Sequence, residues 1–191
     1  MLELTGQLLY FGSPLLLAAL LHGFCIKYDW FSFLKKPLDL GIEFRGKRIF
    51  GNHKTWRGLL MNVVGCCLGT AVQAGFQKGG FIPDQVLWVD YTREGWLVGL
   101  LLGLGTTLGE LPNSFLKRQK GIEPGKKGKG LWGIVFFVFD QIDFLIGIWI
   151  CLFFLIKPSA LVVLWSFLLA LLLHLAVSIT GFLLGMRKTL G

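Results

Sequence analysis

Two carboxylates within an apolar segment are the first residues of this sequence that could do chemistry. Asp140 and Asp143 interrupt the apolar stretch 131–156. A carboxylate inside a transmembrane segment costs at least ~2.5–3.5 kcal/mol, so it is functional by default. The spacing i, i+3 puts both on one helix face, where like charges repel unless a cation or proton lies between them. The pair therefore favours a metal such as Mg²⁺, which prefers oxygen ligands, over ion pairs with basic loops or a transporter's proton relay.

The first of two basic loops, residues 31–57, has the composition of a phosphate-binding segment. Its second half, Arg45–Arg57, combines glycines that let backbone N–H groups approach an anion with cationic and hydroxyl side chains. The candidate substrate-binding residues here are Asn52, Lys54, Thr55 and Arg57. The segment is not a Walker A loop, because G-x-x-x-x-G-K-[ST] is absent. An ordinary basic loop that touches anionic lipid is the alternative, and the role of His53 is left open.

A second basic loop, residues 117–130, repeats this composition shortly before the carboxylate pair. Its candidate residues, with one from the end of the preceding apolar segment, are Ser114, Lys117, Arg118, Pro124, Gly125 and Lys126. Glu110 could line the same cavity from that segment. We expect Lys117 to be catalytic together with Asp140 and Asp143. Two cationic loops would hold a nucleoside triphosphate and the carboxylates would hold its metal, which indicates a membrane enzyme acting on a polyphosphate.

The elements that must position these residues are membrane-spanning helices. Of 191 residues, 54% are hydrophobic and only 16% charged, and the mean hydropathy is +0.66, whereas soluble domains are about 25% charged. Apolar segments of roughly spanning length lie at 7–26, 58–77, 95–116, 131–156 and 159–185. We therefore expect an all-α integral membrane protein with five transmembrane helices, forming one transmembrane catalytic domain over residues 1–191.

Small residues and turn residues predict how these elements pack and connect. Four G-x-x-x-G pairs, whose spacing allows helix backbones to approach closely, are Gly65/Gly69, Gly99/Gly103, Gly105/Gly109 and Gly181/Gly185. In the first basic loop, glycines recur every five residues at Gly41, Gly46 and Gly51. That spacing predicts a loop with short strands or turns rather than one long helix.

The distribution of positive charge predicts the orientation. The sequence has 19 Lys and Arg residues, and those outside the two basic loops, their borders and the C-terminal tail are Lys78, Arg93 and Lys157. Excess Lys and Arg mark the cytoplasmic side. We therefore expect a multi-pass cell-membrane protein with its N-terminus outside, and with its C-terminus, both loops and the active site on the cytoplasmic side. Because topology accounts for the net charge of +8, nucleic-acid binding is disfavoured.

The order of these motifs resembles CTP-dependent cytidylyltransferases that make CDP-activated lipids. Their signature is a serine, Lys-Arg, Pro-Gly and D-x-x-D, which here are Ser114, Lys117-Arg118, Pro124-Gly125 and Asp140/Asp143. The closer resemblance is to the CDP-archaeol synthase family, through the first-loop pattern G-K-R-x-F-G-x-x-K-T-x-R-G and the stretch Gly109–Arg118. Gln141-Ile142 stands where the diacylglycerol enzymes usually have an Arg, which favours the archaeal branch.

The resemblance implies a reaction of CTP with a lipid phosphate that gives a CDP-lipid and pyrophosphate. It implies Mg²⁺ as cofactor, held by Asp140 and Asp143, and a glycerol phosphate with isoprenoid ether chains as the lipid. The residues that would neutralise the triphosphate are Lys54, Arg57, Lys117 and Lys126. The neutral donors would be Asn52, Thr55 and Ser114.

Three other functions stay open on these grounds. A CTP-dependent polyprenol kinase would bind the same nucleotide but would transfer its γ-phosphate to an alcohol. A cation or phosphate transporter would use the aspartate pair as a relay. A non-catalytic lipid-binding assembly factor would show no dependence on CTP.

Overall fold

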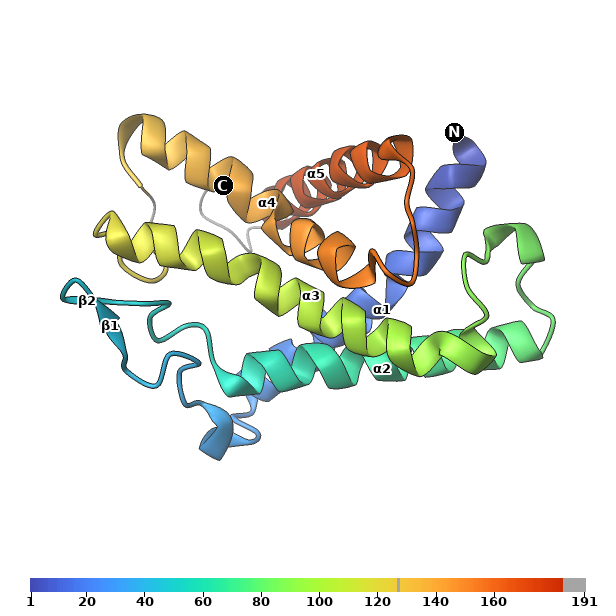
Figure 1. The fold of residues 1–191 in the computed structure, drawn as a ribbon, viewed down its shortest axis with the longest axis horizontal. Coiled ribbons are helices and arrows are strands. Elements are labelled where there is room, and N and C mark those ends of the chain that lie inside the picture. The colour runs from blue at the N-terminus through green and yellow to red at the C-terminus, as the bar shows by residue number, and fades with distance from the viewer. Residues whose placement is uncertain (127, 184–191) are drawn as a thin grey trace.

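The computed structural model describes residues 1–126 and 128–183, and side chains as far as residue 173. It contains five helices in this range, which are α1 (Leu2–Lys27), α2 (Trp56–Lys78), α3 (Tyr91–Gln119), α4 (Gly130–Leu152) and α5 (Ala160–Leu183). Short 3₁₀ helices, η1 (Ser32–Leu34) and η2 (Asp84–Val86), lie in the connections. The predicted helical fold is confirmed (Figure 1). The Gly181/Gly185 pair, Lys127 and the C-terminal tail lie outside the described side chains.

Three of these helices are long and apolar enough to cross a membrane, judged over the described residues. They are α1, α2 and α4. The 29-residue helix α3 is not among them, and only the Ala160–Leu173 part of α5 is counted, as a shorter apolar helix. The chain is thus a helical membrane protein, while the five-span topology and its orientation stay predictions.

Helix α3 is the centre of the fold, because it packs against α2 on one side and α4 on the other (Figure 1). The predicted glycine pairs make these contacts. A Cβ at Gly103 would overlap the backbone of Val63 on α2, and one at Gly105 would lie 2.6 Å from the Cα of Ile148 on α4. Gly65 and Gly69 similarly face α1. Close backbone approach is what G-x-x-x-G pairs permit inside lipid, so the described pairs are confirmed as packing sites.

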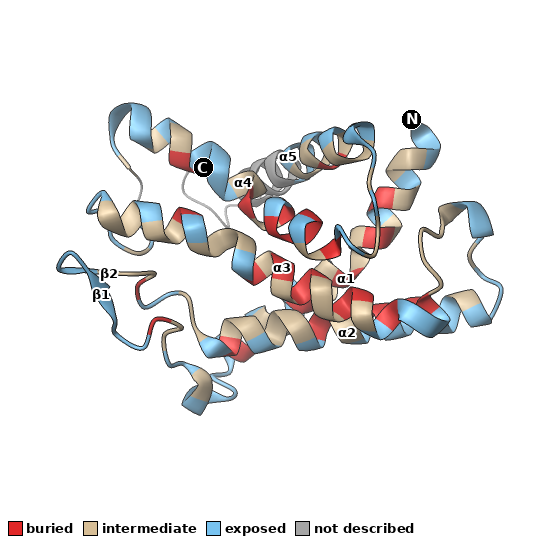
Figure 2. Ribbon diagram, viewed as in Figure 1, coloured by how far each residue is buried: buried red, intermediate tan, exposed pale blue. Residues whose placement is uncertain are grey.

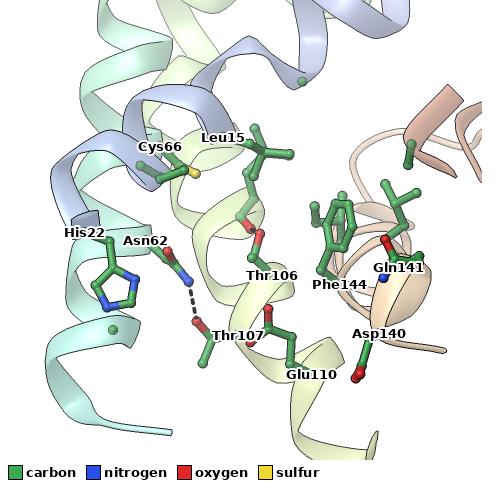
Figure 3. Close-up of a pocket in the computed structure, with 18 of the residues that line it drawn as sticks. Leu15, His22, Asn62, Cys66, Thr106, Thr107, Glu110, Asp140, Gln141 and Phe144 are labelled. Atoms are coloured by element: carbon green, nitrogen blue, oxygen red, sulfur yellow. Dashed lines mark hydrogen bonds between the residues drawn. The ribbon is translucent and has the colours of Figure 1, made fainter. Parts of the chain in front are cut away.

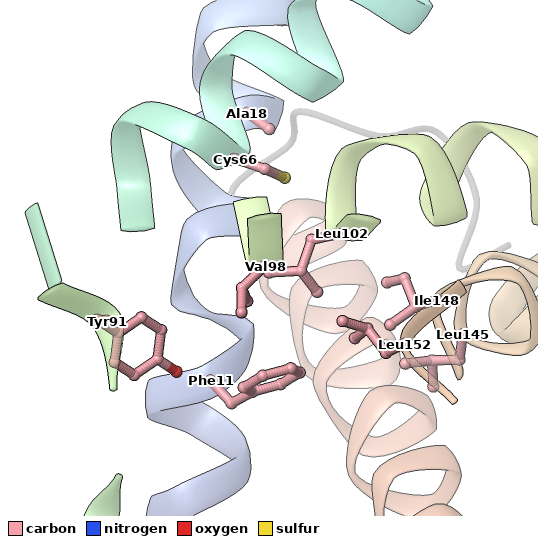
Figure 4. Close-up of a cluster of buried hydrophobic side chains, with 9 residues drawn as sticks. All are labelled: Phe11, Ala18, Cys66, Tyr91, Val98, Leu102, Leu145, Ile148 and Leu152. Atoms are coloured by element: carbon pink, nitrogen blue, oxygen red, sulfur yellow. The ribbon is translucent and has the colours of Figure 1, made fainter. Parts of the chain in front are cut away.

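Buried residues gather on α1, α2, α3 and α4 where these helices pack together (Figure 2). Phe11 of α1, Val98 and Leu102 of α3, and Ile148 and Leu152 of α4 belong to this cluster (Figure 4). Two indole hydrogen bonds attach α5 to the rest. They are Trp149 Nε1 to Ser166 Oγ and Trp165 Nε1 to Thr5 Oγ1, both 2.9 Å.

The first basic loop contains short strands and turns, as its glycines predict. Strands β1 (Glu43–Phe44) and β2 (Lys47–Arg48) form an antiparallel hairpin. The two turn residues, Arg45 and Gly46, have φ of 54° and 71°, which is the positive-φ pair of a two-residue hairpin turn. Lys47 Nζ donates to the carbonyl of Gln119 at 2.7 Å, so the hairpin is attached to the end of α3.

The second basic loop is shorter than the sequence suggests. Helix α3 continues to Gln119, so the predicted loop start at residue 117 is wrong and Lys117 and Arg118 lie on the last helical turn. A glycine cap ends the helix. Gly121, with φ of 74°, donates to the carbonyl of Arg118, and Ile122 donates to that of Lys117, both at 2.9 Å. This is the Schellman arrangement of a helix end.

Candidate active site

The carboxylate pair of α4 meets two side chains of α3. Asn113 Nδ2 donates to Asp140 Oδ1 and to Asp143 Oδ2, each at 2.7 Å. Lys117 Nζ donates to both oxygens of Asp140. The two aspartates therefore share one face of α4, and one amide nitrogen lies between them. Both helices contribute because 113 and 117 are one turn apart, as are 140 and 143.

Glycine residues, which have no side chain, allow the two helices to approach this closely. A Cβ at Gly109 would overlap the carbonyl oxygen of Asp143, and one at Gly147 would overlap the carbonyl oxygen of Gly105. Any side chain at these positions would push α4 away from α3. The glycine pairs thus set the distance at which Asn113 can reach both carboxylates.

The two aspartates differ in burial and in partners. Asp143 is only 6% exposed, and its Oδ1 accepts from the backbone N–H of Phe144 at 2.8 Å. The Asp140 side chain is 43% exposed and is paired with Lys117. Among the described ion pairs none involves Asp143. A structural ion pair therefore accounts for Asp140 alone and leaves the buried charge of Asp143 unexplained.

The donor atoms at this point suit a hard cation. Asp140, Asp143 and the buried, unpartnered Oδ1 of Asn113 are all oxygen donors, which is the ligand type that Mg²⁺ takes. Within the described residues no group of three or more His, Cys, Asp and Glu side chains could hold a metal. The protein thus offers two carboxylates, and Mg²⁺ commonly completes its shell with substrate phosphates and water. The residues fit this ion.

A cavity of about 1100 Å³ begins at Asp140 and extends between the helices (Figure 3). The charged and titratable residues that line its loop end are His53, Lys54, Lys117, Lys126 and Asp140. A second set of polar residues lines the part further in. It consists of His22, Asn62, Thr106, Thr107 and Glu110. The apolar lining beyond them includes Leu8, Phe11, Leu102, Ile148 and Trp149. The cavity is therefore polar where the loops meet it and apolar where the helices enclose it.

The first basic loop reaches this cavity through its last residues. Lys54 Nζ pairs with Glu110 Oε2 of α3, and both side chains line the cavity. Thr55, also in the lining, caps α2, since its Oγ1 accepts from the N–H of Gly58 at 3.2 Å. Such a side chain replaces a missing helical partner for one N–H group of the first turn. The loop is thus fixed to α2 and α3 at the point where it faces Asp140.

Other predicted site residues surround a second, smaller space. This loop cavity, of about 300 Å³ between the two basic loops, is lined by Lys47, Arg48, Gly51, Asn52, Arg118, Gly121, Ile122, Glu123 and Pro124. Gly125 lies next to both spaces. It follows Pro124, which lines the loop cavity, and a Cβ on Gly125 would be 3.3 Å from Cε1 of His53, which lines the larger cavity. The predicted set thus divides into a group beside the carboxylates and a group at the loop cavity.

Four predicted residues line neither cavity, namely Arg57, Ser114, Gly125 and Asp143. Arg57 is 8% exposed, and its Nη1 donates to the carbonyls of Cys25 and Trp30 and to Asp29 Oδ1, at 3.1–3.3 Å. It therefore holds the end of α1 to the start of α2. Ser114 lies on α3 and is partly exposed, and it is absent from the lining of both described cavities.

Sequence reasoning missed two residues that organise the site. Asn113 was not in the predicted set, although Glu110, Asn113 and Lys117 follow the i, i+3, i+7 spacing of one helix face. Asp39 is the other. It is 4% exposed and accepts from the N–H groups of Phe50 and Gly51, both at 2.9 Å.

Asp39 shapes the first loop electrostatically. Burial alone would raise the pKa of its carboxyl group, but hydrogen bonds from Arg48 and from three backbone N–H groups lower that pKa to about 2. Arg48 in turn donates from Nη1 to Asn52 Oδ1 at 2.9 Å. An aspartate followed two residues later by glycine, in an otherwise basic loop, is the signal that could have identified it.

Comparison with known proteins shows the family to which the chain belongs. A family model described as CarS-like, CDP-archaeol synthase, matches residues 32–190. The chain belongs to the CDP-archaeol synthase family. The resemblance read from the sequence is confirmed, and the protein is an enzyme, a nucleotidyltransferase that uses CTP.

Individual relatives support the family assignment over most of the chain. A CDP-archaeol synthase of Methanospirillum hungatei is 34% identical, over 80% of this chain and 87% of that protein. The CDP-archaeol synthase of Methanosarcina barkeri is 31% identical, over 80% and 89%. A solved structure described as an intramembrane enzyme for archaeal membrane lipid biosynthesis has the same fold, with a TM-score of 0.64 at 23% identity over 90% of this chain and 92% of that one.

Proposed function

We propose that this member of the CDP-archaeol synthase family transfers the cytidylyl group of CTP to a glycerol phosphate with isoprenoid ether chains. The products are a CDP-lipid of the CDP-archaeol type and pyrophosphate. One observation carries the proposal. Asp140 and three lysines line the loop end of a cavity whose other end is apolar, and Asn113 links Asp140 to the buried Asp143 behind it. A phosphate-bearing headgroup and its apolar chains match these two ends.

The chemistry needs little from a general base. The second pKa of a phosphomonoester is near ~6, so the lipid phosphate is already largely deprotonated at neutral pH. Its oxygen attacks the α-phosphorus of CTP, and the bond from that phosphorus to the bridging oxygen of the β-phosphate breaks. Pyrophosphate leaves with the electron pair. Positioning and charge neutralisation are the remaining work of the protein.

The described side chains divide this work between them. Lys54, Lys117 and Lys126 would hold triphosphate oxygens, because all three line the loop end of the cavity. Asp140 and Asp143 would hold Mg²⁺, with Asn113 fixing the two carboxylates relative to each other. Mg²⁺ held there would supply positive charge that neutralises the phosphate oxygens. Thr55 supplies a hydroxyl in the lining.

We further propose that the whole chain acts as one domain with both basic loops in the cytoplasm. The loops lie at the same end of the molecule (Figure 1), and that end carries most of its Lys and Arg residues. Cytoplasmic CTP would reach the site from this side. The lipid would enter sideways, between apolar helices, so that only its phosphate reaches the charged end.

Labelled nucleotide tests the reaction directly. CTP labelled at the α-phosphate should put label into lipid when the purified protein is supplied with Mg²⁺ and a diether glycerol phosphate. CTP labelled at the γ-phosphate should release all its label as pyrophosphate. Label from the γ-position in lipid would instead identify a kinase. An absence of lipid label from both nucleotides would contradict the proposal.

A further inference from the structure

Aromatic side chains close the end of the larger cavity that lies farthest from the basic loops. Phe11 of α1 and Trp149 of α4 both line this cavity, and they are only 4% and 7% exposed. Their rings are stacked, with centroids 6.2 Å apart and planes 5° apart. Phe11 also belongs to the buried cluster that contains Leu102 and Leu152 (Figure 4). We call Phe11 and Trp149 the aromatic floor of the cavity.

Contacts outside the cavity hold the aromatic floor in place. Trp88, in the connection between α2 and α3, has its ring centroid 5.1 Å from that of Phe11 and 6.2 Å from that of Trp149. This connection is attached to α1, because Gln7 Nε2 donates to the carbonyl of Gln85 at 2.7 Å. Trp149 is also fixed by its 2.9 Å indole hydrogen bond to α5. Displacing either ring of the floor would therefore break packing behind it.

The depth of the cavity suits a lipid chain. Asp140 at the loop end and Trp149 at the floor both belong to α4, and their separation in sequence corresponds to about 14 Å along a helix. A lipid chain in one leaflet spans about half of the ~30 Å hydrocarbon core. Two exposed leucines of α1, Leu9 and Leu16, also line the cavity, so it opens sideways as well. A chain can therefore enter from the bilayer and end at the floor.

One glycine of α1 leaves free space beside the aromatic floor. Gly12 lines the cavity next to Phe11, and a Cβ there would meet no heavy atom of the described residues within 4 Å. Gly6, on the same helix, has equally open surroundings but is absent from the lining of both described cavities. A larger side chain at Gly12 would therefore fill part of the cavity near its floor, whereas the same side chain at Gly6 would not.

We propose that the aromatic floor of Phe11 and Trp149 limits the length of the isoprenoid chain that the enzyme accepts. This deepens the proposed function and rests on it. The lipid phosphate is held at the loop end, so the floor measures the chain from its phosphate. A chain that reaches the floor buries its whole length against apolar walls. A shorter chain leaves part of the cavity empty, and a longer one must displace a well-packed ring or bend back, which is unfavourable.

Diether glycerol phosphates that differ only in chain length test the proposal. With chains of two to six isoprene units, the wild-type kcat/KM for incorporation of α-label should rise with length and then fall about tenfold or more at one step, since an apolar site discriminates against a misfitting group by this much. Phe11→Ala removes one ring of the floor and should move the fall to a longer chain. Gly12→Leu fills space beside the floor and should move it to a shorter chain.

Gly6→Leu is the matched control, because it adds the same side chain to the same helix outside the cavity, and it should keep the wild-type profile. Phe11→Ala also removes part of the buried cluster, so Gly12→Leu, which adds to open space, decides the proposal if that variant does not fold.

Three results would overturn the chain-length assignment alone. They are a wild-type profile without a fall, an unchanged profile in Gly12→Leu or in a folded Phe11→Ala enzyme, and an equal shift in Gly6→Leu. Failure of the wild type to label lipid of any chain length would instead contradict the proposed function.

Discussion

Replacing Asp143 with asparagine separates a metal-binding role from a structural one. The carboxylate is 6% exposed and has no ion pair among the described residues, so removing its charge leaves no basic side chain without a partner. Asparagine has the same shape. In the wild type, Asp143 accepts from Phe144 N–H at 2.8 Å and from Asn113 Nδ2 at 2.7 Å. The single side-chain oxygen of asparagine can keep one of these two hydrogen bonds.

The expected effect on the two observables is therefore very different. Losing half of the metal-binding carboxylate charge should cost about 3–4 kcal/mol of transition-state stabilisation, which is a hundredfold to thousandfold loss of turnover. The free energy of unfolding should change by only about 1 kcal/mol, because one of the two accepted hydrogen bonds is kept and one is lost. For a chain of this size that corresponds to a melting temperature within about 2–4 °C of the wild type.

Both quantities should be measured on one purified sample, as Mg²⁺-dependent pyrophosphate release from CTP and as thermal unfolding. Asp84→Asn, at an exposed position in the 3₁₀ helix η2, is a matched control that should keep full turnover. A folded Asp143→Asn enzyme with a near-normal rate would refute the metal assignment. A large loss of melting temperature with retained specific activity would support a structural role.

Three further outcomes follow from the fold. Gly109→Ala should lower turnover at least tenfold, because a Cβ there would overlap α4, whereas Gly75→Ala, with no heavy atom within 4 Å, should keep wild-type turnover and melting temperature. The pKa of Asp39, about 2 instead of 3.8, makes unfolding easier as the pH falls from about 4 to 2, since the unfolded chain then binds more protons. Thermal unfolding of Asp39→Asn should lose that pH dependence. Single cysteines at Asp84 and Lys129, in a cysteine-free background, should be labelled from opposite sides of the membrane, and labelling from one side would overturn the topology.

Much of the helical fold could be predicted, because the properties that define it are local. Runs of apolar residues give the helices, and G-x-x-x-G spacing correctly predicts which faces pack, as at Gly103 and Gly105. The end of α3 was placed too early because Lys117 and Arg118 look like loop residues. A cap formed at Gly121 decides that boundary, and backbone hydrogen bonds of this kind leave little trace in composition.

The site could be predicted only where one segment contains the whole pattern. Asp140 and Asp143 share a helix face, so their spacing alone pairs them. The contribution of Asn113 depends on how closely α3 approaches α4, and that distance is set by Gly109 and Gly147 together. Arg57 fits the phosphate-binding pattern of its loop, yet it is directed to the end of α1 by partners far away in the sequence.

The helix with the weakest membrane signal is the one that carries most of the site. Helix α3 is not among the three candidate spans of the described chain, and it provides Glu110, Asn113 and Lys117. These polar groups would be costly against lipid. They are tolerated because α2 and α4 cover the two sides of α3, because Asn113 bonds to the carboxylates of α4, and because Glu110 and Lys117 line the cavity that opens on the third side. The glycines of α3 also help to cover these polar groups, since they allow α2 and α4 to pack closely against α3. Low hydropathy in α3 is thus a consequence of its central position, and in a helical membrane enzyme such a segment is where the search for a site should begin.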